Sequence, residues 1–104
     1  MQTFIITPST NTTKKYDVMQ QTATGSKKIA SFGGKGYSDY TIHNDDVRKT
    51  NYIKRHCVNE DWDDLTKAGT WARYILWNKP TLQDSKKDME KRFNIKIQIK
   101  SIKM

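Results

Sequence analysis

The fold depends on one segment of the sequence, FGGKGYSDYTIH at residues 32–43. A glycine-rich loop can cradle a phosphate, but this one lacks the spacing of a Walker A loop. Gly34 and Gly36 supply only the first half of a G-x-G-x-x-G dinucleotide fingerprint. Glycines also permit the positive φ angles of tight turns. We therefore predict that residues 32–43 form the corner at which a small sheet gives way to helices.

On the N-terminal side of this corner, the sequence predicts strands. Residues 14–20 and 27–32 flank the segment QTATGS, which predicts a hairpin with Gly25 in its turn. The segment TFII at residues 3–6 predicts a further strand. Near the other end, residues 94–100 read NIKIQIK, an alternation typical of a half-buried strand with isoleucines on one face and lysines on the other. We expect the hairpin and the two terminal strands to form a small antiparallel sheet.

On the C-terminal side of the corner, hydrophobic periodicity predicts helices over about residues 45–58, 66–78 and 82–93. Pro80 ends the second of these, because the residue before a proline disfavours helical geometry. Thr81 begins the third in the manner of a capping box. Strands, then helices, then a strand predict an α+β fold, in which the sheet packs against two or three helices. We expect one domain spanning residues 1–104.

The first predicted helix divides into two faces at 3.6 residues per turn. We expect its inner face to consist of Val47, Thr50, Ile53, Cys57 and Val58, and its outer face of Arg48, Lys49, Tyr52, Arg55 and His56. Arginines beside an aromatic ring suit phosphate contacts and base stacking. The candidate nucleic-acid contacts are therefore Arg48, Lys49, Tyr52 and Arg55, with Lys96 and Lys100 of the last strand. The alternative is an ordinary solvated basic face.

The second predicted helix is apolar nearly all round. Its core positions are Ala68, Trp71, Ala72, Ile75 and Leu76, while its reverse side carries Arg73, Tyr74 and Trp77. The composition of the reverse side is that of a protein-interface hot spot, which makes these three residues the candidate interface. The alternative is a core helix that the chain itself covers on both sides.

The charge balance is strongly basic. The 104 residues include 19 Lys and Arg against 11 Asp and Glu, a net charge of +8, which suits an acidic partner such as nucleic acid or an anionic protein surface. The single cysteine, Cys57, allows no intrachain disulfide and favours a reducing compartment. The N-terminus lacks the pattern of a signal peptide, and we expect no membrane span.

No constellation of residues points to catalysis. His56 and Cys57 are adjacent on a predicted helix and point about 100° apart, so they cannot easily share a metal ion. His43 is expected to satisfy a hydrogen bond near the start of that helix. The acidic cluster EDWDD at residues 60–64 supplies helix-start charge or, as the open alternative, binds a cation. We expect a non-enzyme without metal, cofactor or small-molecule substrate.

Three motifs carry a resemblance to a known family. They are GYSDYT at residues 36–41, YIKRH at 52–56 and LWNKPTL at 76–82. Together they resemble, over about residues 27–88, a family of small, basic, uncharacterised proteins encoded by large nucleocytoplasmic DNA viruses of algae and amoebae. The resemblance implies a viral origin and carries no catalytic residues.

Two functions follow as expectations. The first is a virion structural protein, a minor capsid or capsid-associated component that binds other virion proteins. The alternative is a basic protein that binds nucleic acid and accompanies the viral genome. In either case the resemblance implies location in the virion, and in the host cell cytoplasm during assembly.

Overall fold

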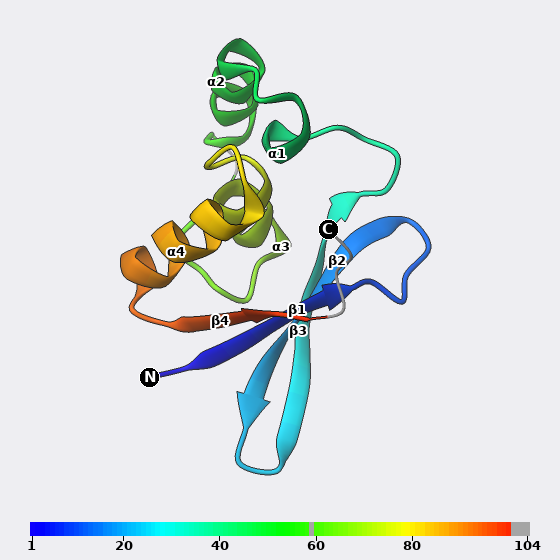
Figure 1. The fold of residues 1–104 in the computed structure, drawn as a ribbon, viewed down its shortest axis with the longest axis vertical. Helices are drawn as coiled ribbons and strands as arrows, with labels where there is room; N and C mark the ends of the chain where they lie inside the picture. Colours follow the sequence, from blue (N-terminus) through cyan, green and yellow to red (C-terminus); the bar gives the residue numbers. More distant parts are fainter. Residues whose placement is uncertain (59, 101–104) are drawn as a thin grey trace.

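The structure is a computed structural model that describes residues 1–58 and 60–100. Its elements follow one another as β1 (Thr3–Pro8), β2 (Lys14–Thr22), β3 (Gly25–Gly34), α1 (Tyr40–His43), α2 (Asp46–His56), α3 (Ala68–Trp71), the π-helical turn η1 (Ala72–Leu76), α4 (Leu82–Phe93) and β4 (Lys96–Ile99). Figure 1 shows the β2–β3 turn at one end of the long axis and α2 at the other. The predicted α+β fold is confirmed.

The sheet has four strands in the order β3-β2-β1-β4. The β2–β3 hairpin and the β1–β2 pair are antiparallel, as expected, but β4 lies parallel to β1, with Thr3 opposite Lys96 and Ile6 opposite Ile99. Alternation of side chains predicts a half-buried strand but carries no information on its direction. Here the chain passes through the helices before β4 pairs with β1 at the edge of the sheet, and parallel strands require such a crossover connection.

Helices cover one face of the sheet and enclose the core there. Phe4 and Phe32 pack against Trp71, with ring centroids 5.1 and 6.4 Å apart. The other members of the core are Ile6, Val18, Tyr74, Ile75, Leu76, Met89, Ile95 and Ile97. The predicted inward positions Trp71, Ile75 and Leu76 are confirmed, whereas Ala68 is exposed because the helix begins only there.

The second predicted helix is not a continuous α-helix. It begins at Ala68 and widens at residues 72–76, where the Trp77 N–H donates to the Ala72 carbonyl at 3.1 Å, five residues back. Such π-helical turns are rare and often accompany functional sites. The widening changes the direction in which the residues after Trp71 point.

The inner face predicted for the first helix is wrong. Val47 of α2 is 69% exposed, and Cys57 and Val58, which follow the helix, are also exposed, whereas Tyr52 of α2 is only 7% exposed. A tyrosine ring removes far more apolar area from water than a valine side chain. The helix therefore turns Tyr52 inward and leaves its small apolar side chains outside.

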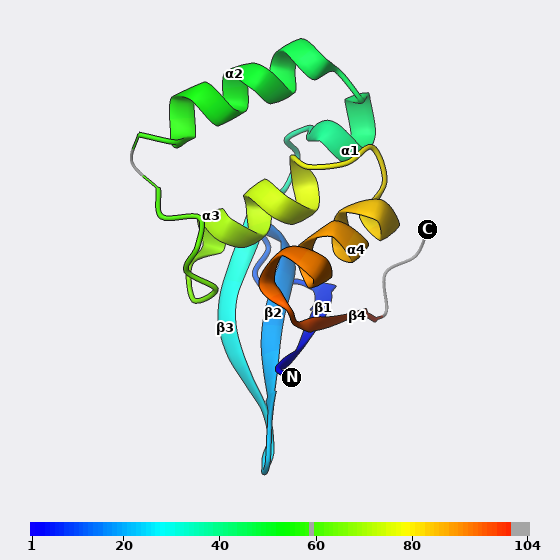
Figure 2. The ribbon, with the colours of Figure 1, turned by 90° about the vertical axis from the view of Figure 1, so that its left-hand side faces the viewer.

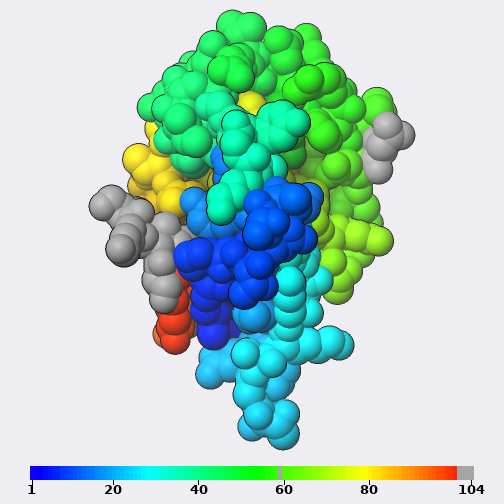
Figure 3. All heavy atoms as spheres, turned by 90° about the vertical axis from the view of Figure 1, so that its right-hand side faces the viewer, coloured from blue at the N-terminus to red at the C-terminus, as the bar shows by residue number. Residues whose placement is uncertain are grey.

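The segment at residues 32–43 is the corner that the sequence predicts. Gly33 has φ +79°, and a Cβ there would lie 2.8 Å from a methyl carbon of Leu76, so both conformation and space favour glycine. Lys35 N–H donates to the Thr13 carbonyl at 2.9 Å, which holds the segment against loop 9–13, as Figure 3 shows from the side. Asp39 caps α1 by accepting from Thr41 N–H at 3.0 Å, and it forms an ion pair with Lys15.

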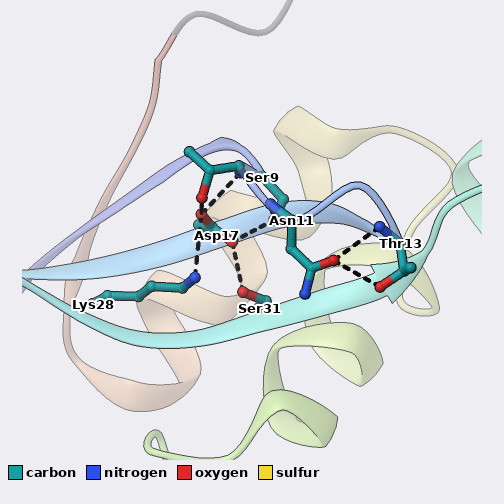
Figure 4. Close-up of polar contacts among 7 residues, drawn as sticks. Ser9, Asn11, Thr13, Asp17, Lys28 and Ser31 are labelled. Carbon is teal, nitrogen blue, oxygen red and sulfur yellow. Dashed lines mark hydrogen bonds and ion pairs between the residues drawn. The ribbon is translucent and has the colours of Figure 1, made fainter.

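A buried carboxylate organises the face of the sheet that points away from the core (Figure 4). Asp17 of β2 is 1% exposed and accepts hydrogen bonds of 2.6 Å from the hydroxyls of Ser9 and Ser31, and one of 3.3 Å from Thr10 N–H. Burial alone would raise the pKa of Asp17. These hydrogen bonds and the nearby Lys28 ammonium, 3.6 Å away, outweigh burial and hold the pKa below its ordinary value.

We predict that Asp17→Ala lowers the free energy of unfolding at pH 7 by about 1.5–3 kcal/mol, because its donors lose a charged acceptor. Since the folded-state pKa of Asp17 is depressed, its contribution is present above about pH 3.9 and is lost as the pH falls through the folded value. Urea unfolding at several pH values measures both effects.

Asp63→Ala is the matched control, since Asp63 is exposed and its carboxylate accepts no hydrogen bond within the described part of the chain. Its effect should stay within about 0.5 kcal/mol. Equal effects of the two substitutions would contradict the assignment of Asp17 as the carboxylate that organises this face of the sheet.

Candidate functional site

A cleft of about 510 Å³ lies between α2 and the end of the sheet beside η1. Figure 2 shows α2 above α3, at the opposite end of the helical layer from β4. One wall of the cleft comes from α2 through Arg48 and Arg55. Tyr37 of the corner segment lines the cleft as well, and Ala72 and Trp77 contribute from η1 and the residue after it. The cleft is therefore built by elements distant in sequence.

Ring stacking fixes α2 over this cleft. The Tyr52 ring lies parallel to the Trp77 indole, with centroids 4.4 Å apart and planes inclined by 3°. His56 stacks on Tyr52 at 4.3 Å, which sandwiches the tyrosine ring. Burial, with a smaller contribution from the Glu60 charge, raises the pKa of Tyr52 to about 12.

Three contacts of polar side chains reinforce the stack near the start of α2. Lys49 donates from Nζ to the Asn78 carbonyl at 2.6 Å, and its ammonium lies 4.8 Å from the centre of the Tyr40 ring. Burial lowers the pKa of Lys49, with the Arg73 charge acting in the same direction. His43 Nδ1 accepts from Asp45 N–H at 2.9 Å, which confirms the hydrogen bond predicted for His43 at the helix start. Side chains thus tie both α1 and the chain after η1 to α2.

Two guanidinium groups at the cleft are free of acidic partners. Arg48 and Arg55 are exposed, and within residues 1–58 and 60–100 no carboxylate lies within ion-pair distance of either. They are seven residues apart, two helical turns, so they share one side of α2. Both also border a second hollow with Lys54, which extends the basic surface around the helix.

The acidic groups at the cleft are already engaged. Asp39 pairs with Lys15, and Glu60 lies 3.3 Å from His56 Nδ1 while accepting a 2.8 Å hydrogen bond from the Trp62 indole. A Cβ at position 69 would lie 1.9 Å from a Glu60 carboxylate oxygen, so only glycine admits this arrangement. The cleft consequently presents its arginines without an opposing free carboxylate in the described chain.

The acidic cluster at residues 60–64 forms turns. Asp64 accepts from both the hydroxyl and the N–H of Thr66, at 2.6 and 2.9 Å, and these hydrogen bonds lower its pKa. Within the described ranges, no three His, Cys, Asp or Glu residues lie close enough to hold a metal ion.

The predicted nucleic-acid contacts fall into three environments. Arg48 and Arg55 meet at the cleft. Tyr52 is enclosed between Trp77 and His56, and Lys49 is bound to a carbonyl, so neither is offered to a ligand. Lys96 and Lys100 are exposed on and just after β4, far from α2 in Figure 1.

The predicted interface residues are occupied within the chain. Tyr74 packs edge-on against Phe93 of α4 at 5.4 Å, and the Arg92 guanidinium lies 4.9 Å from the centre of its ring. Arg73 donates to the Trp77 carbonyl at 2.8 Å, and Trp77 carries the Tyr52 ring. Within the described chain, α2 and α4 cover the reverse side of the second predicted helix, which favours the alternative of a core helix that the chain itself covers.

Sequence reasoning missed Tyr37. Its side chain is 76% exposed, and it lines the cleft with the two arginines. Hydrophobic periodicity has no bearing on a residue inside a glycine-rich turn. What could have indicated Tyr37 is that an aromatic residue stands between a glycine and a serine in a turn, where no core position is expected.

A family of unknown function, DUF5754, matches residues 4–56, half of the chain, and the chain belongs to this family. No curated protein and no solved structure matches it. The resemblance described above spans residues 27–88, so the two overlap only from 27 to 56. The family match extends instead over β1 and β2, and it ends with α2. No helix in the described part of the chain has the length and apolar character to cross a membrane.

We predict that Tyr52→Phe preserves the fold at pH 8 but changes its response to alkali. Because the folded-state pKa of Tyr52 is raised to about 12, its neutral form stabilises the native state below about pH 10, and this contribution is lost as the pH rises towards 12. Wild type should lose about 2 kcal/mol of unfolding free energy that the Phe variant keeps. Urea unfolding monitored by tryptophan fluorescence measures the difference, and a parallel decline in both proteins would contradict the stacked position of Tyr52.

Proposed function

We propose that this member of the DUF5754 family binds nucleic acid through its phosphate backbone, with Arg48 and Arg55 as the principal contacts. The observation that carries the proposal is the pair of exposed guanidinium groups at the cleft, two helical turns apart and unopposed by a free carboxylate in the described chain. Planar guanidinium groups bind phosphate oxygens through two parallel hydrogen bonds.

The surroundings of the two arginines support this role. Lys14 lines the cleft on the side of the sheet, and Lys54 borders the hollow on the other side of the arginines. Together these residues form a basic track from β2 across the cleft to α2. A net charge of +8 would draw a polyanion towards this surface and make binding sensitive to salt.

The proposed role is non-enzymatic. The groups near the cleft that could serve as acids or bases are bound to one another, as in the His56–Glu60 pair. We further propose that the protein is viral and accompanies the genome in the virion, after synthesis in the host cytoplasm. The resemblance of its GYSDYT, YIKRH and LWNKPTL motifs to proteins of large DNA viruses supports this origin.

A second candidate function is that of a minor capsid protein. One observation favours it: α1, α2 and the turn after α2 carry exposed apolar residues, with Ile42 at 65%, Val47 at 69% and Val58 at 76%. A larger coat subunit with an apolar groove would cover such a surface. Of the candidate interface residues, Trp77 would then act by holding α2 in place, and Tyr74 by packing against α4, rather than by touching the partner.

Separating virions into outer shell and DNA-containing core distinguishes the two functions. The proposed function predicts recovery of the protein with the core, and quantitative mass spectrometry of each fraction measures it. Recovery with the shell alone would favour the capsid protein and contradict genome binding.

We predict that Arg48→Ala combined with Arg55→Ala weakens oligonucleotide binding at low salt by about tenfold or more. It should also reduce the slope of log Kd against log salt concentration by about 1.4 for a single strand, because two phosphate contacts no longer release counterions. Fluorescence anisotropy with a labelled oligonucleotide over a range of salt concentrations measures both quantities.

The matched control is Lys87→Ala combined with Lys91→Ala, which removes the same charge from exposed positions of α4. The control should lower affinity only slightly and leave the slope nearly unchanged. Similar losses in the two double variants would mean that binding follows total charge, and would contradict a site at the cleft.

A further inference from the structure

We propose that the cleft selects single-stranded nucleic acid, with Tyr37 as the platform on which one base stacks. The inference rests on the proposed function and adds to it the class of ligand and a specificity-determining residue. It depends on how Tyr37 is held, on what its ring leaves uncovered, and on its position relative to the arginines.

The backbone beneath it positions the Tyr37 ring. A Cβ at position 34 would lie 2.7 Å from Cδ2 of Tyr37 and 3.4 Å from Cε2, so the ring packs directly on the glycine. The Tyr37 N–H donates to the Gly34 carbonyl at 3.2 Å, and Gly36 has φ +89°, which closes the turn. One side of the ring therefore rests on a firm backbone surface.

The rest of the ring is open. Tyr37 is 76% exposed, and within residues 1–58 and 60–100 no other ring or cation stacks on it. The other tyrosine at the cleft, Tyr52, has both ring faces covered by Trp77 and His56. Tyr37 is thus the aromatic at this cleft that remains free to accept a base.

The ends of the corner segment are fixed. Lys35 N–H is bound to the Thr13 carbonyl before the tyrosine, and Asp39 is paired with Lys15 after it. The platform consequently keeps its place at the cleft with respect to Arg48 and Arg55, which line the same space. A ring for the base and guanidinium groups for the phosphates are the two components of single-strand recognition.

Duplex nucleic acid cannot use such a platform. Its bases are stacked on one another, and only their edges are accessible from the grooves. An unpaired base can leave the stack and lie on an aromatic side chain. A cleft of about 510 Å³ falls in the size range of small-ligand sites and admits one nucleotide rather than a double helix.

The test compares a labelled single-stranded oligothymidylate with a duplex at low salt, by fluorescence anisotropy. We expect Tyr37→Ala to weaken single-strand binding about tenfold and duplex binding less than twofold. Tyr37→Phe should stay within about twofold of wild type, because stacking requires the ring and not the hydroxyl. Gly34→Ala should lie between the two, because the added methyl group displaces the ring.

The outcomes separate this inference from the proposed function. If Tyr37→Ala binds both ligands as wild type does, while the Arg48→Ala, Arg55→Ala variant loses both, the stacking platform is wrong and phosphate binding stands. If wild type binds neither ligand at low salt, both proposals are wrong. A loss in Tyr37→Phe equal to that in Tyr37→Ala would contradict stacking as the mechanism. Thermal unfolding of each variant confirms that the exposed substitutions leave the fold intact.

Discussion

The parallel stack of Tyr52 on Trp77 is the contact on which the candidate site depends. It holds α2 over η1, and the Lys49 bond to the Asn78 carbonyl keeps the helix from sliding along that surface. Because Tyr52 must point inward, the rotation of α2 about its axis is determined. Arg48 and Arg55 then face the cleft, and Val47 and Val58 face solvent.

The same stack favours nucleic-acid binding over the role of a minor capsid protein. Aromatic residues that look like an interface in the sequence are used to join helices of one chain, and Tyr74 is likewise enclosed by α4. The surface left for partners is therefore basic at the cleft and modestly apolar on the outside of α2. The two arginines without neutralising carboxylates indicate a binding surface more strongly than the exposed valines do. Isolated exposed valines are ordinary on protein surfaces.

Much of the fold could be predicted from local sequence. The hairpin around Gly25, the Thr81 cap and the alternating last strand depend on neighbouring residues, and the structure contains all three. Which side of α2 faces the core could not be predicted in this way. The stacking partner of Tyr52, Trp77, lies 25 residues further along the chain, and hydrophobic periodicity assigns valine and cysteine side chains to the core. The π-helical turn and the parallel direction of β4 also depend on tertiary packing. Of the site, the two arginines were found through their spacing, whereas Tyr37 belongs to no periodic pattern.

Binding of single-stranded nucleic acid at the α2 cleft is tested most directly by NMR, titrating ¹⁵N-labelled protein with a short single-stranded oligonucleotide at low salt. We expect the largest amide shifts on Gly34, Tyr37 and the residues around Arg48 and Arg55, together with a shift of the Trp77 indole. Shifts centred on β4 around Lys96 and Lys100, with the α2 cleft unaffected, would contradict binding at the cleft.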